Sequence, residues 1–443
     1  MTRRKALAGL AAVLALPVLT GCSGMTAAAD VDQVPVQEQS LEIWQRKGPG
    51  SPSDLIGQEL VREFTEETGI PATMTSISDN FEIKLQQRAV QRNLPDIVIN
   101  DTAQLGNMQS QGFLREIDRE QIEGSADINE RAWDGARSYY GGYYGVPMTA
   151  HTVALMNRKD WRENLGLPVP QDWESLVDMW RGYVGDDPTG TGQEVAGIAV
   201  PGTTERGYIS WNTSTFFWSG GGEYFEETPE GYRSAVADDG SVAAATWIRD
   251  LACTENVLQP GASSQDTTNA KETFQTGGAG SFLVAPYELP ALVDALGDDL
   301  EALRPPPGPA GLTTLAEGNN VYLMEGSASE TAQERFAEFV ISPEGQEIGM
   351  AGHEDGNIVR LPVNSTVDMG GMRDAHEWET VQELYDDNGR YVPAVPNWTP
   401  FLTASANTLN ALISDCSLDV RTEMEELDQV FTAELADQEV LAP

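Results

Sequence analysis

The stretch Leu94-Pro95-Asp96-Ile97-Val98-Ile99-Asn100 decides the fold, because it is a short continuous apolar run that begins beside a proline. Such runs are typical of strands that are buried on both faces of a parallel sheet. Before it, residues 41–44 and 70–77 have strand-like patterns, and apolar residues at helical spacing predict helices over 54–68 and 81–90. The order strand, helix, strand, helix, strand predicts parallel strands joined by crossover helices, and hence an α/β sheet.

A second α/β pattern follows Gly145-Val146-Pro147. Strands are predicted over residues 152–156, 197–200, 279–285 and 320–324, and helices over 157–164, after Asp172 and over 330–341. Ligands of α/β sheets lie beyond the carboxyl ends of the strands. In the first pattern these ends are followed by residues 45–49, 78–80 and 101–104, which we therefore expect to line a binding site.

The N-terminus has the features of an export signal. Residues 3–5 are basic, and the apolar run over 6–19 is shorter than the roughly 20 residues needed to span a bilayer. The run ends in Leu19-Thr20-Gly21-Cys22, which resembles a bacterial lipobox, whose cysteine receives lipid. We expect a signal peptide over 1–21, lipidation of Cys22 and a flexible tether over 22–39. A buried helix followed by an incidental cysteine is the alternative, and the export route, general or twin-arginine, stays open.

Length and charge restrict the classes of partner. The remainder of the chain, about 400 residues, is too long for one core and indicates two domains. The net charge is −42, or −45 once the basic residues 3–5 leave with the signal, and the carboxylates are spread along the whole chain. This charge repels nucleic acid and anionic lipid headgroups, so we expect neither as a partner. A cationic substrate is one interpretation of the acidity, and solubility in salty surroundings is the other.

The cysteines and histidines argue against a metal site. After Cys22 only Cys253 and Cys416 remain, and two cysteines in an exported protein fit a disulfide, with two buried thiols as the alternative. No Cys-x-x-Cys occurs, and the chain has three histidines. We expect no metal and no cofactor.

Six segments, taken in order, carry a family resemblance. The most specific is Gly166-Leu167-Pro168-Val169-Pro170-Gln171-Asp172-Trp173-Glu174-Ser175-Leu176, and the others are 60–70, 84–98, 144–160, 274–282 and 330–346. Together they resemble extracellular solute-binding proteins of ABC importers, the family that includes maltose-binding and other sugar-binding proteins. The segment over 166–176 is similar to that family's Pro-x-x-Trp-x-x-Leu helix start.

The resemblance implies a fold and a role. The fold is an α/β, two-lobed periplasmic-binding-protein-like fold (type II), in which each lobe is a mostly parallel sheet flanked by helices and the ligand cleft lies at the hinge. We expect an N-terminal lobe of residues 40–148 plus 281–316 and a C-terminal lobe of 149–280 plus 317–443. The implied role is to capture a sugar or oligosaccharide outside the cell and deliver it to an ABC-transporter permease. The protein would act as a monomer, tied to the membrane by the lipid on Cys22 alone.

Candidate ligand residues follow from the chemistry of sugars, which need flat aromatic faces and polar groups for their hydroxyls. The aromatic candidates are Tyr208, Trp211, Tyr287 and Trp398, with Trp44 and Trp218 as weaker ones. Tyr287 closes Ala285-Pro286-Tyr287, which resembles the family's return strand, and Trp398 lies in an irregular segment between helices. Core packing is the alternative interpretation for each of these rings.

The polar candidates are Lys47, Asp101, His151 and Asn319. Asp101 follows the buried strand and resembles a cleft position of the family, although a helix cap would also explain it. His151 follows Pro147 by four positions, where the family often has a carboxylate or an amide, so this chain departs from the pattern. For Lys47 a surface role and for His151 a structural role are the alternatives.

Two other functions have some support in the sequence. A secreted glycoside hydrolase needs one carboxylic acid and one base at a set distance, but the sequence has no Gly-x-Ser-x-Gly, His-Glu-x-x-His or phosphate-binding loop. We therefore expect no enzymatic activity. Tyr139-Tyr140 and Tyr143-Tyr144 resemble the tyrosine pairs of ferric-ion binders, although a strand or turn role is simpler. A polyol, peptide or polyamine cargo remains the main alternative.

Overall fold

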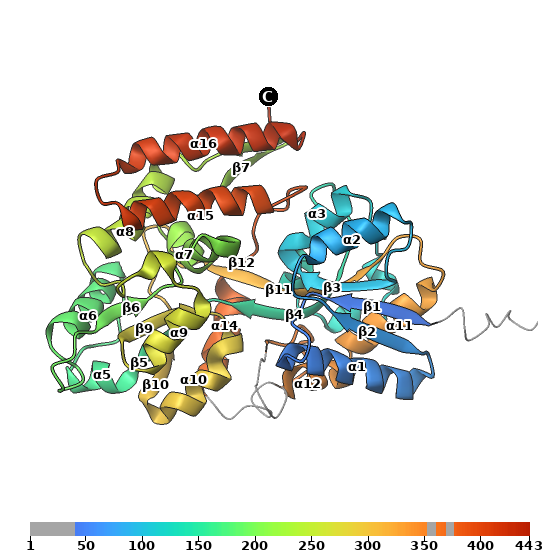
Figure 1. The fold of residues 1–443 in the computed structure, drawn as a ribbon, viewed down its shortest axis with the longest axis horizontal. Coiled ribbons are helices and arrows are strands. Elements are labelled where there is room, and N and C mark those ends of the chain that lie inside the picture. Colours follow the sequence, from blue (N-terminus) through green and yellow to red (C-terminus); the bar gives the residue numbers. More distant parts are fainter. Residues whose placement is uncertain (1–39, 352–359, 369–375) are drawn as a thin grey trace, which may run out of the picture. The chain divides into compact units, whose positions relative to one another are not determined.

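The computed structural model describes residues 40–351, 360–368 and 376–443. The expected signal peptide, the lipidation at Cys22 and the tether lie outside the described residues. The described part contains two sheets with helices against them and a layer of long helices near the C-terminus (Figure 1).

The first sheet has the strand order β12-β11-β3-β1-β2, with β4 paired to β11. Its strands are β1 (Leu41–Gln45), β2 (Ala72–Ser76), β3 (Ile97–Asp101), β4 (Val146–Thr152), β11 (Thr314–Leu323) and β12 (Gly389–Arg390). As predicted, β1 pairs in parallel with both β2 and β3. The crossover helices are α1 (Pro52–Thr68) and α2 (Phe81–Val90).

Local sequence explains where α1 begins and ends. The side chain of Ser51 accepts a hydrogen bond from the backbone N–H of Asp54, and Pro52 occupies the first turn, where its missing N–H costs nothing. At the other end Gly69 adopts the left-handed conformation at φ 70°, which glycine takes without strain. The apolar face of α1 then packs on the sheet through Leu60 and Phe64, which are both fully buried.

The second sheet has the order β10-β5-β9-β6. It contains β5 (Ala154–Arg158), β6 (Ala196–Ala199), β9 (Ala279–Val284) and β10 (Leu300–Leu303). Only β6 and β9 are parallel, while β5 runs antiparallel to β9 and β10. The expectation of a mostly parallel sheet is therefore wrong for this one. The reason is that β5 continues directly from β4 after Val153, so it enters the sheet in the opposite direction to strands that arrive from crossover helices.

The strand pairing groups the segments in another way than the expected division of the chain, whose lobe boundaries stay a prediction. Residues 281–316 were expected in the N-terminal lobe, but β9 and β10, which cover 279–303, belong to the second sheet. Conversely, residues 317–323 of β11 and α11 (Glu330–Ile341), expected in the C-terminal lobe, lie with the first sheet. Phe336 of α11 packs against Phe64 of α1, with ring centroids 5.2 Å apart. Long-range ladders decide these memberships, and the order of segments along the chain does not reveal them.

Helices cover the second sheet and extend beyond it. The helices are α5 (Lys159–Asn164), α6 (Trp173–Gly185), α7 (Tyr208–Ser219), α8 (Asp239–Cys253), α9 (Thr267–Gln275), α10 (Leu289–Leu296), α15 (Thr399–Ser414) and α16 (Val420–Asp437). In Figure 1, α15 and α16 lie side by side, in red, above α7 and α8. A disulfide joins Cys253, at the end of α8, to Cys416, between α15 and α16.

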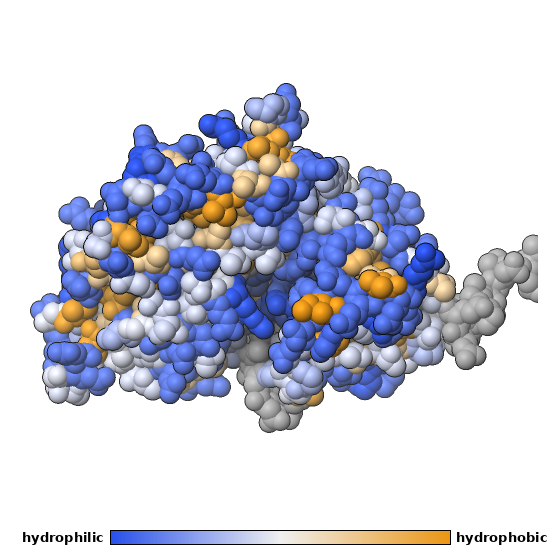
Figure 2. Space-filling model, turned by 45° about the horizontal axis from the view of Figure 1, so that its top comes forward, coloured by the Kyte–Doolittle hydropathy of each residue, from blue (hydrophilic) through white to orange (hydrophobic). Residues whose placement is uncertain are grey.

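Shorter elements complete the described fold. They are α3 (Leu105–Ser110), α4 (Glu130–Asp134), α12 (Pro343–Ala351), α14 (Glu377–Asn388) and the two-stranded ribbon of β7 (Phe225–Thr228) and β8 (Gly231–Ser234). The face drawn in Figure 2 is mostly hydrophilic, with hydrophobic residues in small separate patches. Within the described ranges, no helix combines the length and apolarity that crossing a membrane requires.

Candidate ligand-binding site

A set of six charged or ionisable side chains, which we call the charged cluster, gathers where the strands of the first sheet end. Parallel strands β1 and β3 bring their carboxyl ends to the same edge of the sheet, so Arg46 and Lys47 lie beside Asp101. The neighbouring strands β4 and β11 contribute His151 and Glu317, which are paired residues of their ladder. Arg360 comes from the segment that follows α12 and meets the ring of His151.

Asp101 is held by contacts that use both of its oxygens. Arg46 forms an ion pair with Oδ2, and the amide of Asn319 donates a 2.8 Å hydrogen bond to Oδ1. Arg46 also donates to Oδ1 of Asn100 at 2.9 Å. Burial alone would raise the pKa of Asp101, but the positive charges of Arg46, Lys47 and Arg360 outweigh it and lower the pKa. Asp101 is therefore ionised at neutral pH.

His151 lies between a carboxyl group and a guanidinium group. Its Nε2 is 3.2 Å from Oε2 of Glu317, and its Nδ1 accepts a 3.2 Å hydrogen bond from Nη1 of Arg360. Burial, together with the charge of Arg360, lowers the pKa of His151 well below its usual value. A neutral imidazole that accepts at Nδ1 carries its proton on Nε2, which donates to Glu317.

Glu317 keeps its proton at neutral pH. Burial is the main cause, with the nearby charge of Asp101, and together they raise its pKa to about 8 against the pull of Arg360, Arg46 and Lys47. A protonated carboxyl group has an O–H to donate. The pair of Glu317 and His151 is thus neutral overall, and Glu317 can offer a hydrogen bond to a ligand oxygen.

Tyr287 contacts the charged cluster through its ring, and Tyr208 lies near it. The ring of Tyr287 lies edge-on to His151, with centroids 6.0 Å apart, and the guanidinium of Arg360 lies over the Tyr287 ring at 5.8 Å. Burial raises the pKa of Tyr287, and its neighbours Glu288 and Tyr208 act in the same direction. Tyr287 is therefore a neutral phenol, with Tyr208 close to it.

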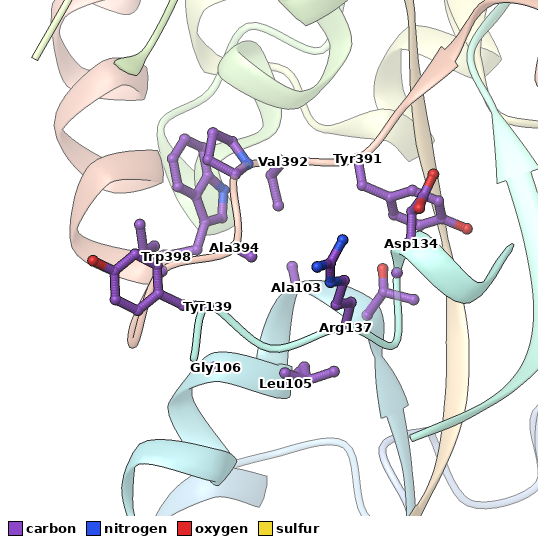
Figure 3. A pocket seen from close by; sticks show the side chains of 14 residues that line it. Ala103, Leu105, Gly106, Asp134, Arg137, Tyr139, Tyr391, Val392, Ala394 and Trp398 are labelled. Atoms are coloured by element: carbon purple, nitrogen blue, oxygen red, sulfur yellow. The ribbon is translucent and has the colours of Figure 1, made fainter. Parts of the chain in front are cut away.

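A pocket opens beside the charged cluster, at the residues that follow Asp101. It contains about 420 Å³ of space, including its open mouth, and is lined by Thr102, Ala103, Leu105, Gly106, Asp134, Gly135, Arg137, Tyr139, Val395, Trp398 and residues 391–394. Figure 3 shows Trp398 and Tyr139 at one end, Tyr391 and Asp134 at the other, and the guanidinium of Arg137 pointing between them. The pocket thus combines aromatic faces with charged groups.

The comparisons with known proteins match this architecture. A family model described as "Bacterial extracellular solute-binding protein" matches residues 50–347. The chain belongs to this family. Among curated proteins it is 24% identical, over 350 residues, to the "Putative ABC transporter periplasmic-binding protein YcjN" of Escherichia coli K12, which covers 74% of this chain and 71% of that protein.

Solved structures of this type share the fold at low sequence identity. One is the GacH receptor of Streptomyces glaucescens, described unliganded and with acarbose, with a TM-score of 0.75, 18% identity, and coverage of 90% of this chain and 98% of that chain. Another is maltose-bound MalE3 of T. maritima, with a TM-score of 0.74, 16% identity, and coverage of 89% and 100%. The two-lobed α/β fold expected for a solute-binding protein is thereby confirmed.

In this solute-binding protein the four polar residues that were predicted from the sequence lie close together. Asn319 contacts Asp101 directly, and His151 belongs to the same charged cluster as Lys47. Tyr287 and Tyr208 stand beside them. The structure thus brings six of the eight predicted ligand residues into one region, although their roles in binding stay predictions.

Trp398 and Trp211, the other two predicted ligand residues, do not belong to this group of six. Trp398 is buried in the core around α15, with its ring 5.8 Å from Phe401 and 5.1 Å from Tyr224, but it also lines the pocket. Its buried indole N–H has no hydrogen-bond partner among the described residues. Trp211 is half-buried against the same core and lines neither the pocket nor the charged cluster, so core packing explains it better.

The weaker aromatic candidates and the tyrosine pairs have other contacts. Trp44 and Trp218 are buried, each under an arginine, with the guanidinium 5.0 and 5.1 Å from the ring centroid. Tyr139 and Tyr140 pack edge-on against each other, and Tyr143 packs on Trp133. No group of three or more His, Cys, Asp or Glu side chains in the described part of the chain could hold a metal ion.

Several site residues were missed from the sequence. Arg46 lies within residues 45–49, which the rule that ligands bind at strand ends includes, but it is not among the named candidates. Glu317 lies within β11, and only the ladder with β4 brings it to His151. Arg360 follows no predicted strand or helix, and no sequence signal marks it. The same holds for Arg137 and Tyr391, which reach the pocket from segments about 250 residues apart in the chain.

Proposed function

We propose that this protein captures a sugar or oligosaccharide outside the cell and delivers it to the permease of an ABC importer. The observation that carries the proposal is the meeting of the charged cluster with an aromatic pocket at the edge of the first sheet. Asp101 and Asn319 stand at the shared boundary, because Thr102, the next residue along the chain, lines the pocket.

The groups in this region fit the chemistry of a sugar. Each sugar hydroxyl can both donate and accept a hydrogen bond, so a site needs partners of both kinds. Asp101 accepts, whereas Lys47, Arg360 and the protonated Glu317 donate. The rings of Tyr287, Tyr139 and Trp398 supply apolar faces for the C–H surface of the sugar.

The related proteins support the same cargo. The names of the two structural neighbours mention acarbose and maltose, which are saccharides. The name of the E. coli relative assigns it to an ABC transporter. These names describe those proteins, and in this one they favour a saccharide over a polyol, peptide or polyamine.

The fold supports delivery by lobe closure. We assign one lobe to the first sheet with α1, α2 and α11, and the other to the second sheet with its helices. The chain passes between them at β4–β5 and β11, which run through the charged cluster. Ligand-induced closure around such connections is a known way to make the loaded state recognisable to a partner. Here the partner would be the permease, and the binding protein would act as a monomer.

Attachment to the outer face of the cell membrane completes the proposal. The lipobox-like Leu19-Thr20-Gly21-Cys22 supports a lipid on Cys22, and a flexible tether would keep the protein near its permease at high local concentration. Cys22→Ala should release the protein from the membrane and abolish labelling by a radioactive fatty acid. A Cys22→Ala protein that stays lipid-labelled and membrane-bound would contradict the anchor.

We propose binding without catalysis. A glycoside hydrolase needs a carboxylic acid and a carboxylate at a set distance across the bond that it cleaves, whereas the family that this chain matches consists of binding proteins. Incubation of the purified protein with oligosaccharides should leave them intact. Release of shorter products would overturn this part of the proposal.

A thermal-shift screen tests the cargo. The purified protein is heated with saccharides, polyols, peptides and polyamines in parallel. A ligand present at 100 times its dissociation constant adds about 2.7 kcal/mol to the free energy of unfolding. We expect stabilisation by at least one saccharide, and stabilisation by another class alone would refute the sugar assignment.

A further inference from the structure

The charged cluster holds two basic side chains, Lys47 and Arg360, that lack a carboxylate partner among the described residues. Arg46 is paired with Asp101, but no carboxylate oxygen of the described residues lies within 4.0 Å of the Lys47 ammonium or of the Arg360 guanidinium. Arg360 donates to the neutral ring of His151, and Lys47 makes no side-chain hydrogen bond within the described part of the chain. This is unusual in a protein of net charge −42.

Three nearby carboxyl groups are engaged elsewhere or uncharged, while a fourth, Glu82, acts on Arg46. Asp101 is held by Arg46 and Asn319, and Glu288, next to Tyr287, forms a 2.7 Å ion pair with Lys271. Glu317 keeps its proton at neutral pH and therefore brings no negative charge to Arg360. The region around Lys47 and Arg360 thus has an excess of positive charge.

The pKa of Lys47 reflects this excess of positive charge. The residue as a whole is only partly buried, yet loss of hydration at its ammonium group lowers its pKa to about 7, and the charge of Arg360 acts in the same direction. Moving cations away from water without a counter-charge costs free energy, and a carboxylate that arrives with the ligand removes that cost. The fork of donors on an arginine matches the two oxygens of a carboxylate.

We propose that the captured saccharide is acidic, and that Lys47 and Arg360 hold its carboxylate. This inference rests on the proposed function and names its substrate class: sugars that contain a uronic acid. Asp101, Asn319 and Glu317 would bind the neutral hydroxyls, with Tyr287 against one face of the ring.

The acidic surface does not prevent such a ligand from binding. Exposed carboxylates act through water, and salt screens them beyond about 8 Å at physiological ionic strength. Lys47 and Arg360 are partly buried, so salt screens their interaction with a bound carboxylate less than it screens fully exposed charges. At the adjoining pocket Arg137 supplies a further guanidinium, with Asp134 as its acidic neighbour (Figure 3).

The test is a titration with matched sugars. Isothermal titration calorimetry measures the binding of glucuronate- and galacturonate-containing disaccharides, of their methyl esters, and of the neutral glucose and galactose disaccharides. The methyl ester keeps the shape of the sugar and removes its charge. We expect the acid to bind roughly 10- to 100-fold more tightly than its ester, as charged hydrogen bonds of this kind imply.

Two single substitutions test whether Lys47 and Arg360 hold the carboxylate. Lys47→Gln and Arg360→Gln should each reduce the preference for the acid over the ester to roughly 3- to 10-fold, because one of the two charge contacts remains. Lys84→Gln is the matched control, because Lys84 is an exposed lysine of α2 outside the site, and it should keep the preference.

Each contrary outcome has a distinct meaning. Equal binding of acid, ester and neutral sugar by the wild-type protein would overturn the acidic cargo and leave sugar capture standing. A preference for a sulfated disaccharide over the uronate would overturn the assignment to a carboxylate. Binding of a polyamine or peptide and of no saccharide would overturn the proposed function itself.

Discussion

His151 and Glu317 face each other across β4 and β11, with Nε2 3.2 Å from Oε2 and with exposed side-chain fractions of 6% and 13%. The two residues are direct partners in the strand ladder, so the backbone fixes their separation. Around them stand Asp101, Arg46, Lys47 and Arg360, whose charges act on the pair. The sheet therefore holds a neutral imidazole and a neutral carboxyl group at the centre of a charged site.

The first prediction concerns how stability depends on pH through Glu317. Its pKa is raised from 4.5 to about 8, so between these values the folded protein keeps a proton that the unfolded chain releases. The stabilisation from this proton is fully present below pH 4.5, decreases as the pH rises, and is gone above pH 8. Relative to Glu317→Gln, the wild type should lose at most about 1.4 kcal/mol per pH unit within that window.

Urea denaturation of both proteins between pH 4 and pH 9 measures this difference. His151 and Lys47, whose pKa values are lowered, contribute stability that rises with pH, but both residues are present in both proteins. Their contribution largely cancels when the two curves are subtracted. A difference curve without slope between pH 4.5 and 8 would show that Glu317 is ionised in the folded protein.

The second prediction concerns Asp101. Asp101→Asn removes the partner of Arg46 and leaves a guanidinium group without a counter-charge. We expect the free energy of unfolding to fall by about 1–3 kcal/mol, and saccharide affinity to fall roughly tenfold or more, because charged hydrogen bonds contribute on that scale. Calorimetric titration and urea denaturation give the two values. Asp298→Asn is the matched control, since Asp298 is exposed and distant in sequence from the site; a loss of affinity in it would discredit the comparison.

The third prediction concerns the pocket. A Cβ added at Gly106 would overlap the carbonyl oxygen of Val395, so Gly106→Ala should push the segment over 391–395 away from α3. We expect a destabilisation of about 1–3 kcal/mol and weaker saccharide binding. Gly185→Ala in α6 meets no atom within 4 Å and should leave binding unchanged. If Gly106→Ala bound saccharide as well as Gly185→Ala does, the pocket would not be part of the site.

The fourth prediction concerns the disulfide of Cys253 and Cys416. It closes a loop across 163 residues and ties α8 to the connection between α15 and α16. Replacing both cysteines by serine should lower the free energy of unfolding by roughly 2–4 kcal/mol, chiefly because the unfolded chain gains freedom. Urea denaturation with and without reductant measures this loss. A wild-type midpoint that does not respond to reductant would mean that the bond adds no stability.

Local patterns predicted the parts of the fold that rest on local interactions. The strands at 41–45, 72–76 and 97–101 and the helix over 330–341 agree with the predicted segments within a few residues. Each has a clear periodicity and a recognisable start or stop. The resemblance to solute-binding proteins, drawn from the order of such segments, is confirmed by the family match over residues 50–347.

Other parts could not be predicted because tertiary contacts decide them. Helix α7 is buried on nearly every side, so its aromatic-rich sequence shows no amphipathic stripe. The assignment of β9, β10 and β11 to their sheets depends on ladders between distant segments. The dual placement of Trp398, in a core and at the pocket, likewise depends on residues from several elements.

The residues of the candidate site also fall into two groups: those that the sequence predicted and those that tertiary contacts bring together. Lys47 and Asp101 follow predicted strands, and the rule that ligands bind at strand ends found them. Glu317 and His151 become partners only through the ladder between β4 and β11, and Arg360 reaches His151 from a segment 209 residues away. The unusual protonation of these groups follows from mutual burial, which a single sequence does not reveal.

The most direct test that this site binds a sugar compares two dissociation constants. One is measured with the wild type and the other with the double variant His151→Ala/Tyr287→Ala, both for one saccharide chosen by the thermal-shift screen. Calorimetry supplies both values under identical conditions, and circular dichroism confirms that the variant is folded. We predict a loss of affinity of roughly 100-fold, because the variant removes the ring face of Tyr287 and the imidazole that contacts Glu317 and Arg360. An unchanged dissociation constant in the folded variant would contradict the claim that this site binds the sugar.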